Sequence, residues 1–125
     1  MQPVTQGITV YQGDTFDFFF RVRNRVYDVA TSAYIAGTYV DLTGWTGKAQ
    51  IRANADAAVV LAEFSVTISN QITTPGGVLL VLTPALTAAL PATGGFWDVE
   101  LTNAVAEVRT FIAGAVTVTK QITRV

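Results

Sequence analysis

The sequence predicts an all-β protein, an immunoglobulin-like antiparallel β-sandwich of about seven to eight strands with one short helical crossover. Three observations predict this fold. The 125 residues are rich in Thr, Val, Ile and Phe, which favour strands, whereas Gly, Asn and Pro mark breaks. Several segments alternate apolar and polar residues with a period of two. The predicted strands recur every ~8–12 residues with turn signals between them, so residues 1–125 are expected to form a single domain.

The first two predicted strands lie near the amino terminus, at residues 7–12 and 15–24. In the second strand, apolar residues occupy every other position and would share one buried face. These inward residues are Phe16, Phe18, Phe20 and Val22. Phe19 is an aromatic residue among the outward positions, most of which are charged.

Residues 25–40 interrupt this rhythm and are predicted to be an insertion, either a hairpin with its turn near residues 30–32 or a long loop. The alternation of inward and outward residues resumes over residues 45–53. A tight turn at residues 54–57 then leads into a further strand at residues 58–69.

The strand at residues 78–82 is apolar on both faces, as expected of a central strand. The helical crossover follows it. Thr83 can cap the helix and Pro84 suits its first position, while Leu86 and Leu90 are predicted to share one face.

The last two predicted strands are residues 96–102 and 107–119, and Gly114 within the second marks a bulge or a close approach of another backbone segment. We expect the inward residues of all strands to form one core between two sheets. Its predicted members are Phe16, Phe18, Phe20, Trp45, Ile51, Phe64, Val66, Leu80, Leu82, Trp97, Val99 and Leu101.

The composition narrows the functional classes. The chain has no Cys and no His, which removes disulfides, thiolate metal sites, cysteine nucleophiles and the commonest general base. Charged residues make up 14% and the net charge is −1, so we expect neither nucleic acid nor a membrane as partner. The apolar runs are too short for a membrane helix, and the first residues do not resemble a signal peptide. With 50% hydrophobic residues, the chain is expected to associate with other proteins.

Two groups of acidic residues are candidate chemical sites. Asp98 and Glu100 lie two apart on a predicted strand, so both carboxylates project from one face, as in a pair that acts on a glycosidic bond. Their apolar flanks favour an ordinary outward polar face instead, and we predict no catalytic residue. A second group lacks the spacing of a calcium loop, and we predict no metal and no cofactor. Its members are Asp14, Asp17, Asp28 and Asp41.

Aromatic residues offer two further possibilities. Trp45 and Trp97 could form a sugar-stacking platform, but both fall in register with apolar residues, which favours core packing. The insertion at residues 25–40 carries several tyrosines, and tyrosine is enriched at protein interfaces. We predict that these residues and the neighbouring Phe19 contact a partner: Tyr27, Tyr34, Ile35 and Tyr39. The alternative is that the insertion folds back and covers Phe19.

Several short motifs resemble one protein family. They are Gln12-Gly13-Asp14-Thr15-Phe16, Asp41-Leu42-Thr43-Gly44-Trp45, Gln50-Ile51-Arg52, Leu82-Thr83-Pro84, Ala89-Leu90-Pro91, Trp97-Asp98-Val99-Glu100-Leu101 and Gly114-Ala115-Val116-Thr117-Val118. Together they span nearly the whole chain, and it resembles small structural proteins of tailed bacteriophages, in particular the N-terminal domain family of the phage upper-baseplate protein. The insertion at residues 25–40 is longer than the usual second hairpin of that family.

The resemblance implies an immunoglobulin-like, non-catalytic building block of the virion, assembled in the host cytoplasm. Its implied partners are other virion proteins in a symmetric assembly. The favoured function is an adaptor in the tail, baseplate or fibre region. A capsid decoration (cement) protein is the alternative in the same class. A carbohydrate-binding adhesion module is the second alternative, with carbohydrate ranked behind protein as a partner.

Overall fold

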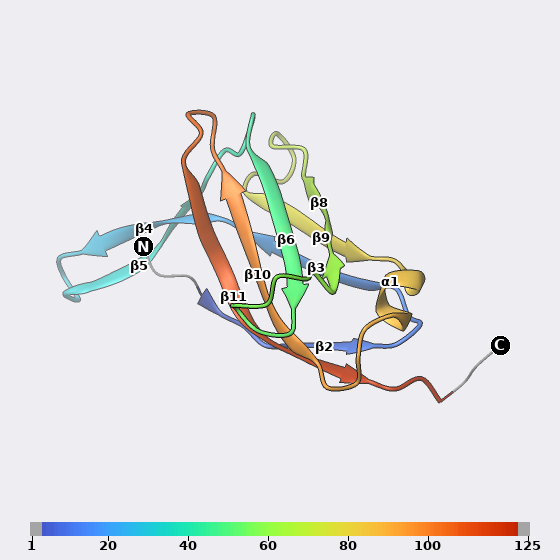
Figure 1. Cartoon of the computed structure of the whole chain (residues 1–125). Helices are drawn as coiled ribbons and strands as arrows, with labels where there is room; N and C mark the ends of the chain where they lie inside the picture. The colour runs from blue at the N-terminus through green and yellow to red at the C-terminus, as the bar shows by residue number, and fades with distance from the viewer. Residues whose placement is uncertain (1–3, 123–125) are drawn as a thin grey trace.

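The computed structural model describes residues 4–122, apart from the side chains of residues 25–27 (Figure 1). Most of the strands lie in two sheets that pack face to face. The six-stranded sheet has the order β1-β11-β10-β6-β7, with β2 also paired to β11. Its strands are β1 (Val4–Thr5), β2 (Ile8–Tyr11), β6 (Thr46–Arg52), β7 (Ala62–Glu63), β10 (Gly95–Thr102) and β11 (Val108–Thr119).

The second sheet has the order β3-β9-β8, and a separate pair, β4-β5, forms a hairpin. These strands are β3 (Phe16–Arg21), β9 (Gly77–Leu82), β8 (Ser65–Ile68), β4 (Arg23–Asp28) and β5 (Ala33–Tyr39). The helix α1 (Pro84–Ala88) carries the chain from β9 back to β10 in the larger sheet. Because the chain passes repeatedly between two sheets in this order, the predicted immunoglobulin-like sandwich is confirmed.

Two details of that prediction are wrong. The sandwich is not wholly antiparallel, because β1 and β2 both run parallel to β11. The strand predicted over residues 58–69 is split, because β7 pairs with β6 in the larger sheet while β8 pairs with β9 in the smaller one. Phe64 lies at the switch, buried, with its N–H donated to the carbonyl of Ala49 (2.9 Å). With β1, the hairpin strands and this split, the described strands outnumber the seven to eight expected.

The core contains the predicted residues. Each of them is either buried or packed against the buried cluster, so the predicted register of inward and outward faces is confirmed. The ring of Trp97 lies at its centre, 5.5 Å from the ring of Phe18 and 5.9 Å from that of Phe64. Its indole N–H donates to the carbonyl of Gln6 (2.8 Å), so the polar tip is satisfied within the fold.

The short helix begins as predicted, and its buried residue is Thr87. Thr83 caps it by accepting from the N–H of Leu86 (3.4 Å), and Pro84 occupies its first turn. Leu86 and Leu90, which were predicted to share one face, differ in burial, because Leu86 is 36% exposed while Leu90 lies beyond the end of the helix and is 2% exposed. The Thr87 hydroxyl donates to the carbonyl of Asp14 (2.8 Å), and this bond connects the helix to the β2–β3 turn.

Of the two roles predicted for Gly114, a bulge or a close backbone approach, the structure shows the close approach. A Cβ atom there would collide with the carbonyl oxygen of Gln6, where the chain passes from β1 to β2 along β11. The irregularity in the β10–β11 ladder lies elsewhere, between Val99 and Glu100. Gly114 therefore allows two successive segments to pair with the same strand.

Candidate interaction surface

Three connections meet at one end of the sandwich, which we call the hairpin end. They are residues 22–45, which include the β4-β5 hairpin, and the loops at residues 69–76 and 103–107. Hydrogen bonds join the first two: the N–H of Val22 donates to the carbonyl of Gly76 (2.8 Å), and the N–H of Leu42 donates to the side-chain oxygen of Gln71 (2.8 Å). The hairpin end is therefore fixed at its base.

The insertion at residues 25–40 is a hairpin, which was one of the two predicted forms. Strands β4 and β5 pair with each other and, within the described residues, with no other strand. Figure 1 shows the pair projecting sideways from the sandwich. Nearly all of β5 is exposed. A two-stranded hairpin is at best marginally stable in water, so this element depends on its root or on a partner.

The root of the hairpin is organised around Tyr39. The guanidinium of Arg21 lies over its ring, 3.5 Å from the centroid, and that of Arg23 lies 4.7 Å from the same centroid. The Nε–H of Arg21 donates to the carbonyl of Pro75 (3.1 Å). Although Tyr39 is 36% exposed, its ring therefore makes cation–π contacts within the chain that stabilise the root of the hairpin.

The tip of the hairpin is a turn at the predicted place. The Asp28 carboxylate accepts from the N–H of Ala30 (3.0 Å) and from the hydroxyl of Thr31 (3.1 Å), and Ser32 adopts a left-handed conformation with φ of 53°. Asp28 therefore makes the turn, as short acidic side chains commonly do.

The other predicted contact residues are exposed. Tyr34 is 61% exposed and Ile35 is 49% exposed on β5, while Phe19 is 50% exposed on β3. The hairpin therefore does not fold back to cover Phe19. The side chain of Tyr27 lies outside the described part of the chain. Whether these residues contact a partner stays a prediction.

Exposed aliphatic residues that were not predicted lie at the tips of the neighbouring connections. Val29 is 82% exposed, Ile72 is 92% exposed and Val105 is 74% exposed. Each lies one or two positions after an Asp or Asn, and this spacing is the signal that sequence reasoning overlooked. Asp and Asn bond to backbone N–H groups just ahead and so form turns that expose the intervening side chains.

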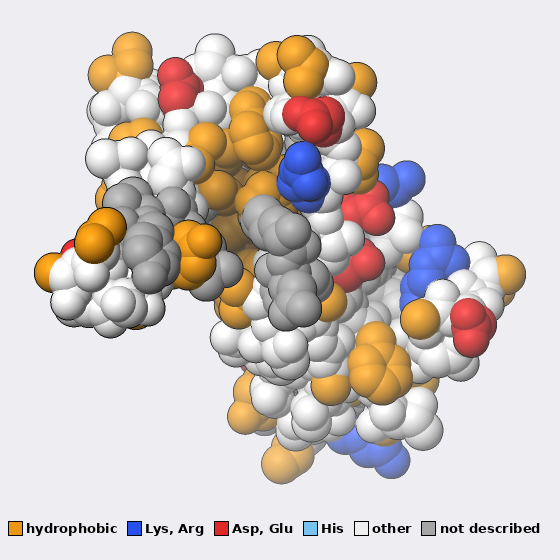
Figure 2. Space-filling view, turned by 90° about the vertical axis from the view of Figure 1, so that its left-hand side faces the viewer, with side chains coloured by type: hydrophobic (Ala, Val, Ile, Leu, Met, Phe, Trp, Pro, Cys, Tyr) orange, Lys and Arg blue, Asp and Glu red, His pale blue; other side chains and the backbone are white. Residues whose placement is uncertain are grey.

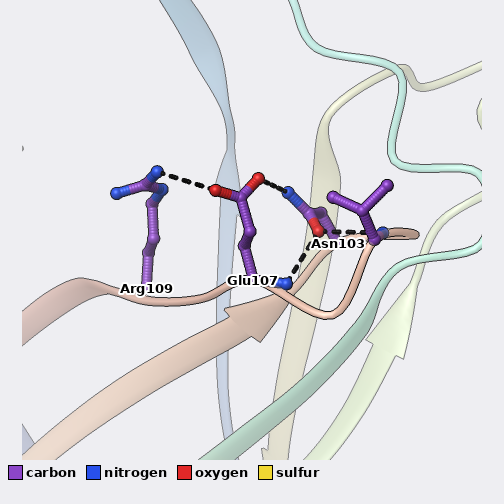
Figure 3. A network of polar contacts seen from close by, with 4 residues as sticks. Asn103, Glu107 and Arg109 are labelled. Atoms are coloured by element: carbon purple, nitrogen blue, oxygen red, sulfur yellow. Dashed lines mark hydrogen bonds and ion pairs between the residues drawn. The ribbon is translucent and has the colours of Figure 1, made fainter.

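The two loops show this bracing directly. The side-chain oxygen of Asn103 accepts from the N–H groups of Val105 and Glu107, both at 3.0 Å, and its NH₂ donates to the Glu107 carboxylate (2.9 Å) (Figure 3). Arg109 completes the network by an ion pair of 3.4 Å with Glu107. In the other loop the side chain of Asn70 accepts from the N–H of Ile72 (2.9 Å). The apolar tips are therefore held out by formed turns.

Figure 2 views the molecule from the side of the hairpin and shows hydrophobic side chains in a hollow between two lobes, with more at the loop tips. Acidic and basic side chains lie beside them, mainly along the right-hand side of this view. Monomeric proteins rarely expose contiguous apolar patches beyond a few hundred Å², and larger ones mark contact sites. The hairpin end therefore has the character of an interaction surface.

The acidic residues lie apart from this surface or serve local structure. Asp98 and Glu100 project from the outer face of the larger sheet. Asp41 accepts from the hydroxyl (2.6 Å) and the N–H (3.0 Å) of Thr43, and these bonds lower its pKa. Among the described residues, no three acidic side chains gather as metal ligands. No described helix is long and apolar enough to cross a membrane.

The predicted core placement of both tryptophans is confirmed. Trp97 is 3% exposed, and Trp45 is partly buried against the core, with its ring 6.3 Å from that of Phe111. Neither ring forms an exposed sugar platform.

No protein-family model matches the sequence, and no curated protein is significantly similar to it. Among solved structures, the chain is similar to a chimeric titin Z1Z2 functionalised with an exogenous peptide from decorin, at 17% identity and a TM-score of 0.45, over 96% of this chain and 92% of that one. It is also similar to the titin domains Z1Z2 in complex with telethonin, at 15% identity and a TM-score of 0.45, over 96% of this chain and 45% of that one. These likenesses carry no argument about function, and the fold assignment rests on the strand order.

Proposed function

We propose that the chain is a non-catalytic structural protein of a tailed-phage virion, an adaptor in the tail, baseplate or fibre region that docks through its hairpin end. The observation that carries the proposal is the β4-β5 hairpin, which projects from the sandwich with Tyr34 and Ile35 exposed. The resemblance of the sequence motifs to phage baseplate proteins supports the place of this module in a virion.

A partner protein would supply strand pairing at the edges of the hairpin. Its two strands leave both outer edges unpaired within the described residues, and unpaired edges accept strands from other chains. Two loops at the same end of the sandwich carry further exposed aliphatic residues, Ile72 and Val105. Because the turns under these residues are already formed, little conformational entropy is lost when they bind.

The partner class is another virion protein in a symmetric assembly. The charged residues are few and the net charge is −1, so the chain lacks the basic surface that a nucleic acid partner requires. The absence of Cys and His removes cysteine nucleophiles and the commonest general base, which supports a non-catalytic role.

The test compares two triple variants that change similar residues at opposite ends. Val29→Ser with Tyr34→Ser and Ile35→Ser alters the hairpin, where the three residues are 82%, 61% and 49% exposed. The matched control changes Val59 between β6 and β7, Tyr11 at the end of β2 and Leu86 in α1 to Ser, which are 70%, 55% and 36% exposed. Each variant is expressed in cells infected by a phage that lacks the gene, and its amount in purified particles is measured with its melting temperature.

We expect the hairpin triple to keep its melting temperature and to lose incorporation, while the control keeps both. Normal incorporation of the hairpin triple, or equal loss in both variants, would contradict docking through the hairpin end. Electron microscopy of the particles then separates the two virion roles: density at the tail, baseplate or fibres supports the adaptor, and density over the capsid shell supports the decoration protein.

A further inference from the structure

The outer face of the larger sheet contains a hollow of about 450 Å³ near its α1 end. Its side chains come from β6, the loop after β6, and β10: Gln50, Arg52, Asn54, Phe96, Asp98 and Glu100. The hollow exists because the neighbouring strand carries small residues there. In the register of β11, Ala113 lies opposite Asp98 and Ala115 lies opposite Phe96, so no large side chain fills the space beside β10.

An exposed aromatic ring borders the hollow. Phe96 points outward on β10 and is 54% exposed, although it lies in a regular strand between Arg52 on one side and Ala115 on the other. A Phe in that position has no core to pack against. Its ring offers a flat apolar surface directly beside the polar side chains of the hollow.

The two carboxylates in the hollow have free acceptor capacity. Within the described residues, neither the Asp98 carboxylate nor the Glu100 carboxylate has a hydrogen bond or an ion pair. Burial, and then the nearby Glu100 carboxylate, raise the pKa of Asp98, while Arg52 partly opposes them. Arg52 itself is occupied elsewhere, because its guanidinium donates to the carbonyl of Ala57 (2.8 Å) and to the side chain of Gln50 (3.0 Å).

Each of the two acidic side chains in the hollow has a basic residue nearby. Glu100 lies opposite Lys48 in the β6–β10 register, and Arg52 lines the hollow with Asp98. Figure 2 shows acidic and basic side chains next to one another along this side of the molecule. These basic residues weaken the attraction of the two carboxylates for a cation.

We infer that this hollow binds a neutral sugar, with one face of a pyranose ring against Phe96 and its hydroxyls donating to Asp98 and Glu100. A sugar ring has an apolar face for the aromatic side chain and several hydroxyl donors for the unpaired carboxylates. The amide of Asn54 can both donate and accept. The hollow lies within the usual size range of small-molecule sites. The alternative ligand, an Arg or Lys side chain of a protein, would also suit two carboxylates and a ring, but the neighbouring Lys48 and Arg52 disfavour it.

This inference is independent of the proposed docking function, because the hollow is on the outer sheet face near α1 and the docking surface is at the opposite end. The test uses the purified isotope-labelled protein and two-dimensional NMR. Glucose, galactose, mannose and N-acetylglucosamine are each titrated to high millimolar concentration, and N-acetyl-arginine amide is titrated as the cationic probe.

We expect at least one sugar to shift the backbone signals of Gln50, Arg52 and Asp98. Phe96→Ala and Asp98→Asn should each weaken that binding about tenfold or more, as the loss of one favourable contact of this kind does. The matched controls are Phe19→Ala, which removes a ring of similar exposure (50%) on the other sheet, and Asp17→Asn, which removes an exposed carboxylate there. Neither control should change the affinity.

Three results would overturn the inference. The first is that no sugar shifts these signals. The second is that the cationic probe shifts them and the sugars do not, which would assign the hollow to a basic side chain of a protein. The third is that the controls weaken binding as much as the two site variants, which would place the effect elsewhere.

Discussion

The two ends of the sandwich differ in where their side chains find partners. At the α1 end, the Thr87 hydroxyl accepts from the N–H of Gly13 (3.0 Å) and donates to the carbonyl of Asp14 (2.8 Å), and the Gln12 side chain donates to the carbonyl of Leu90 (2.8 Å). Thr87 is completely buried. At the hairpin end, equally well-formed turns hold apolar side chains out into solvent. The polar groups at the α1 end therefore bond to one another within the chain, whereas the hairpin end exposes apolar side chains to solvent.

This difference shows that the high apolar content of the chain is not spread evenly. Exposed Val, Ile and Tyr residues occur at both ends. At the hairpin end they lie on the projecting β4-β5 hairpin and on two loops at the same end of the sandwich. Polar groups at the α1 end are satisfied locally, so that end gains little from a partner. The predictions below test this contrast.

The largest effect is expected from removing the hydroxyl that ties α1 to the β2–β3 turn. Thr87→Val keeps the volume but leaves the N–H of Gly13 and the carbonyl of Asp14 without their partner. Leaving such groups unsatisfied should lower the free energy of unfolding by about 2 kcal/mol. Denaturant unfolding measures it. Thr38→Val on the exposed hairpin strand is the control and should change it by less than about 0.5 kcal/mol. Equal losses in both variants would refute the contrast between the ends.

Much of the fold could be predicted from local patterns. The period-two alternation correctly assigned the inward residues of β3, β6 and β10, because one face of each strand packs on the core. The Thr83-Pro84 pair correctly placed the start of the helix, since capping depends on adjacent residues only. Gly114 correctly indicated a close backbone approach.

The features that were missed depend on partners distant in the sequence. Alternation does not tell which sheet a segment joins, so the switch at Phe64 and the parallel pairing of β2 were not predicted. A helix of 5 residues is too short for periodicity to identify its buried face, so the burial of Thr87 was not predicted. The hollow beside Phe96 depends on small residues of β11, which only the strand register brings opposite.

An intermediate effect is expected at the hairpin root. Tyr39→Leu removes the ring that lies beneath the guanidinium groups of Arg21 and Arg23. The hairpin should then open locally at a free energy lower by about 1 kcal/mol, which is the size of a partly exposed cation–π contact. Hydrogen exchange should speed up in β4 and β5 and stay unchanged in β9. The control is Tyr11→Leu, an exposed tyrosine near α1. If exchange in the hairpin does not change, the root does not depend on Tyr39.

The smallest effect concerns pH, where two aspartates should act with opposite sign. Burial and the Glu100 carboxylate raise the pKa of Asp98 above 3.8, so ionising Asp98 disfavours the folded state. Its contribution to stability is complete below that value and is lost as the pH rises through the folded-state pKa. Bonds from Thr43 lower the pKa of Asp41, so its contribution is complete above 3.8 and is lost as the pH falls through the folded-state pKa.

Unfolding of each variant is therefore compared with wild type between about pH 2 and pH 7. Asp98→Asn should be more stable than wild type at neutral pH, by less than about 1 kcal/mol because the side chain is partly solvated, and the difference should vanish in acid. Asp41→Asn should be less stable than wild type at neutral pH and should converge with it in acid. Differences of the same sign for both variants would show that the carboxylate in the hollow is no more deprived of water than the one at the hairpin end.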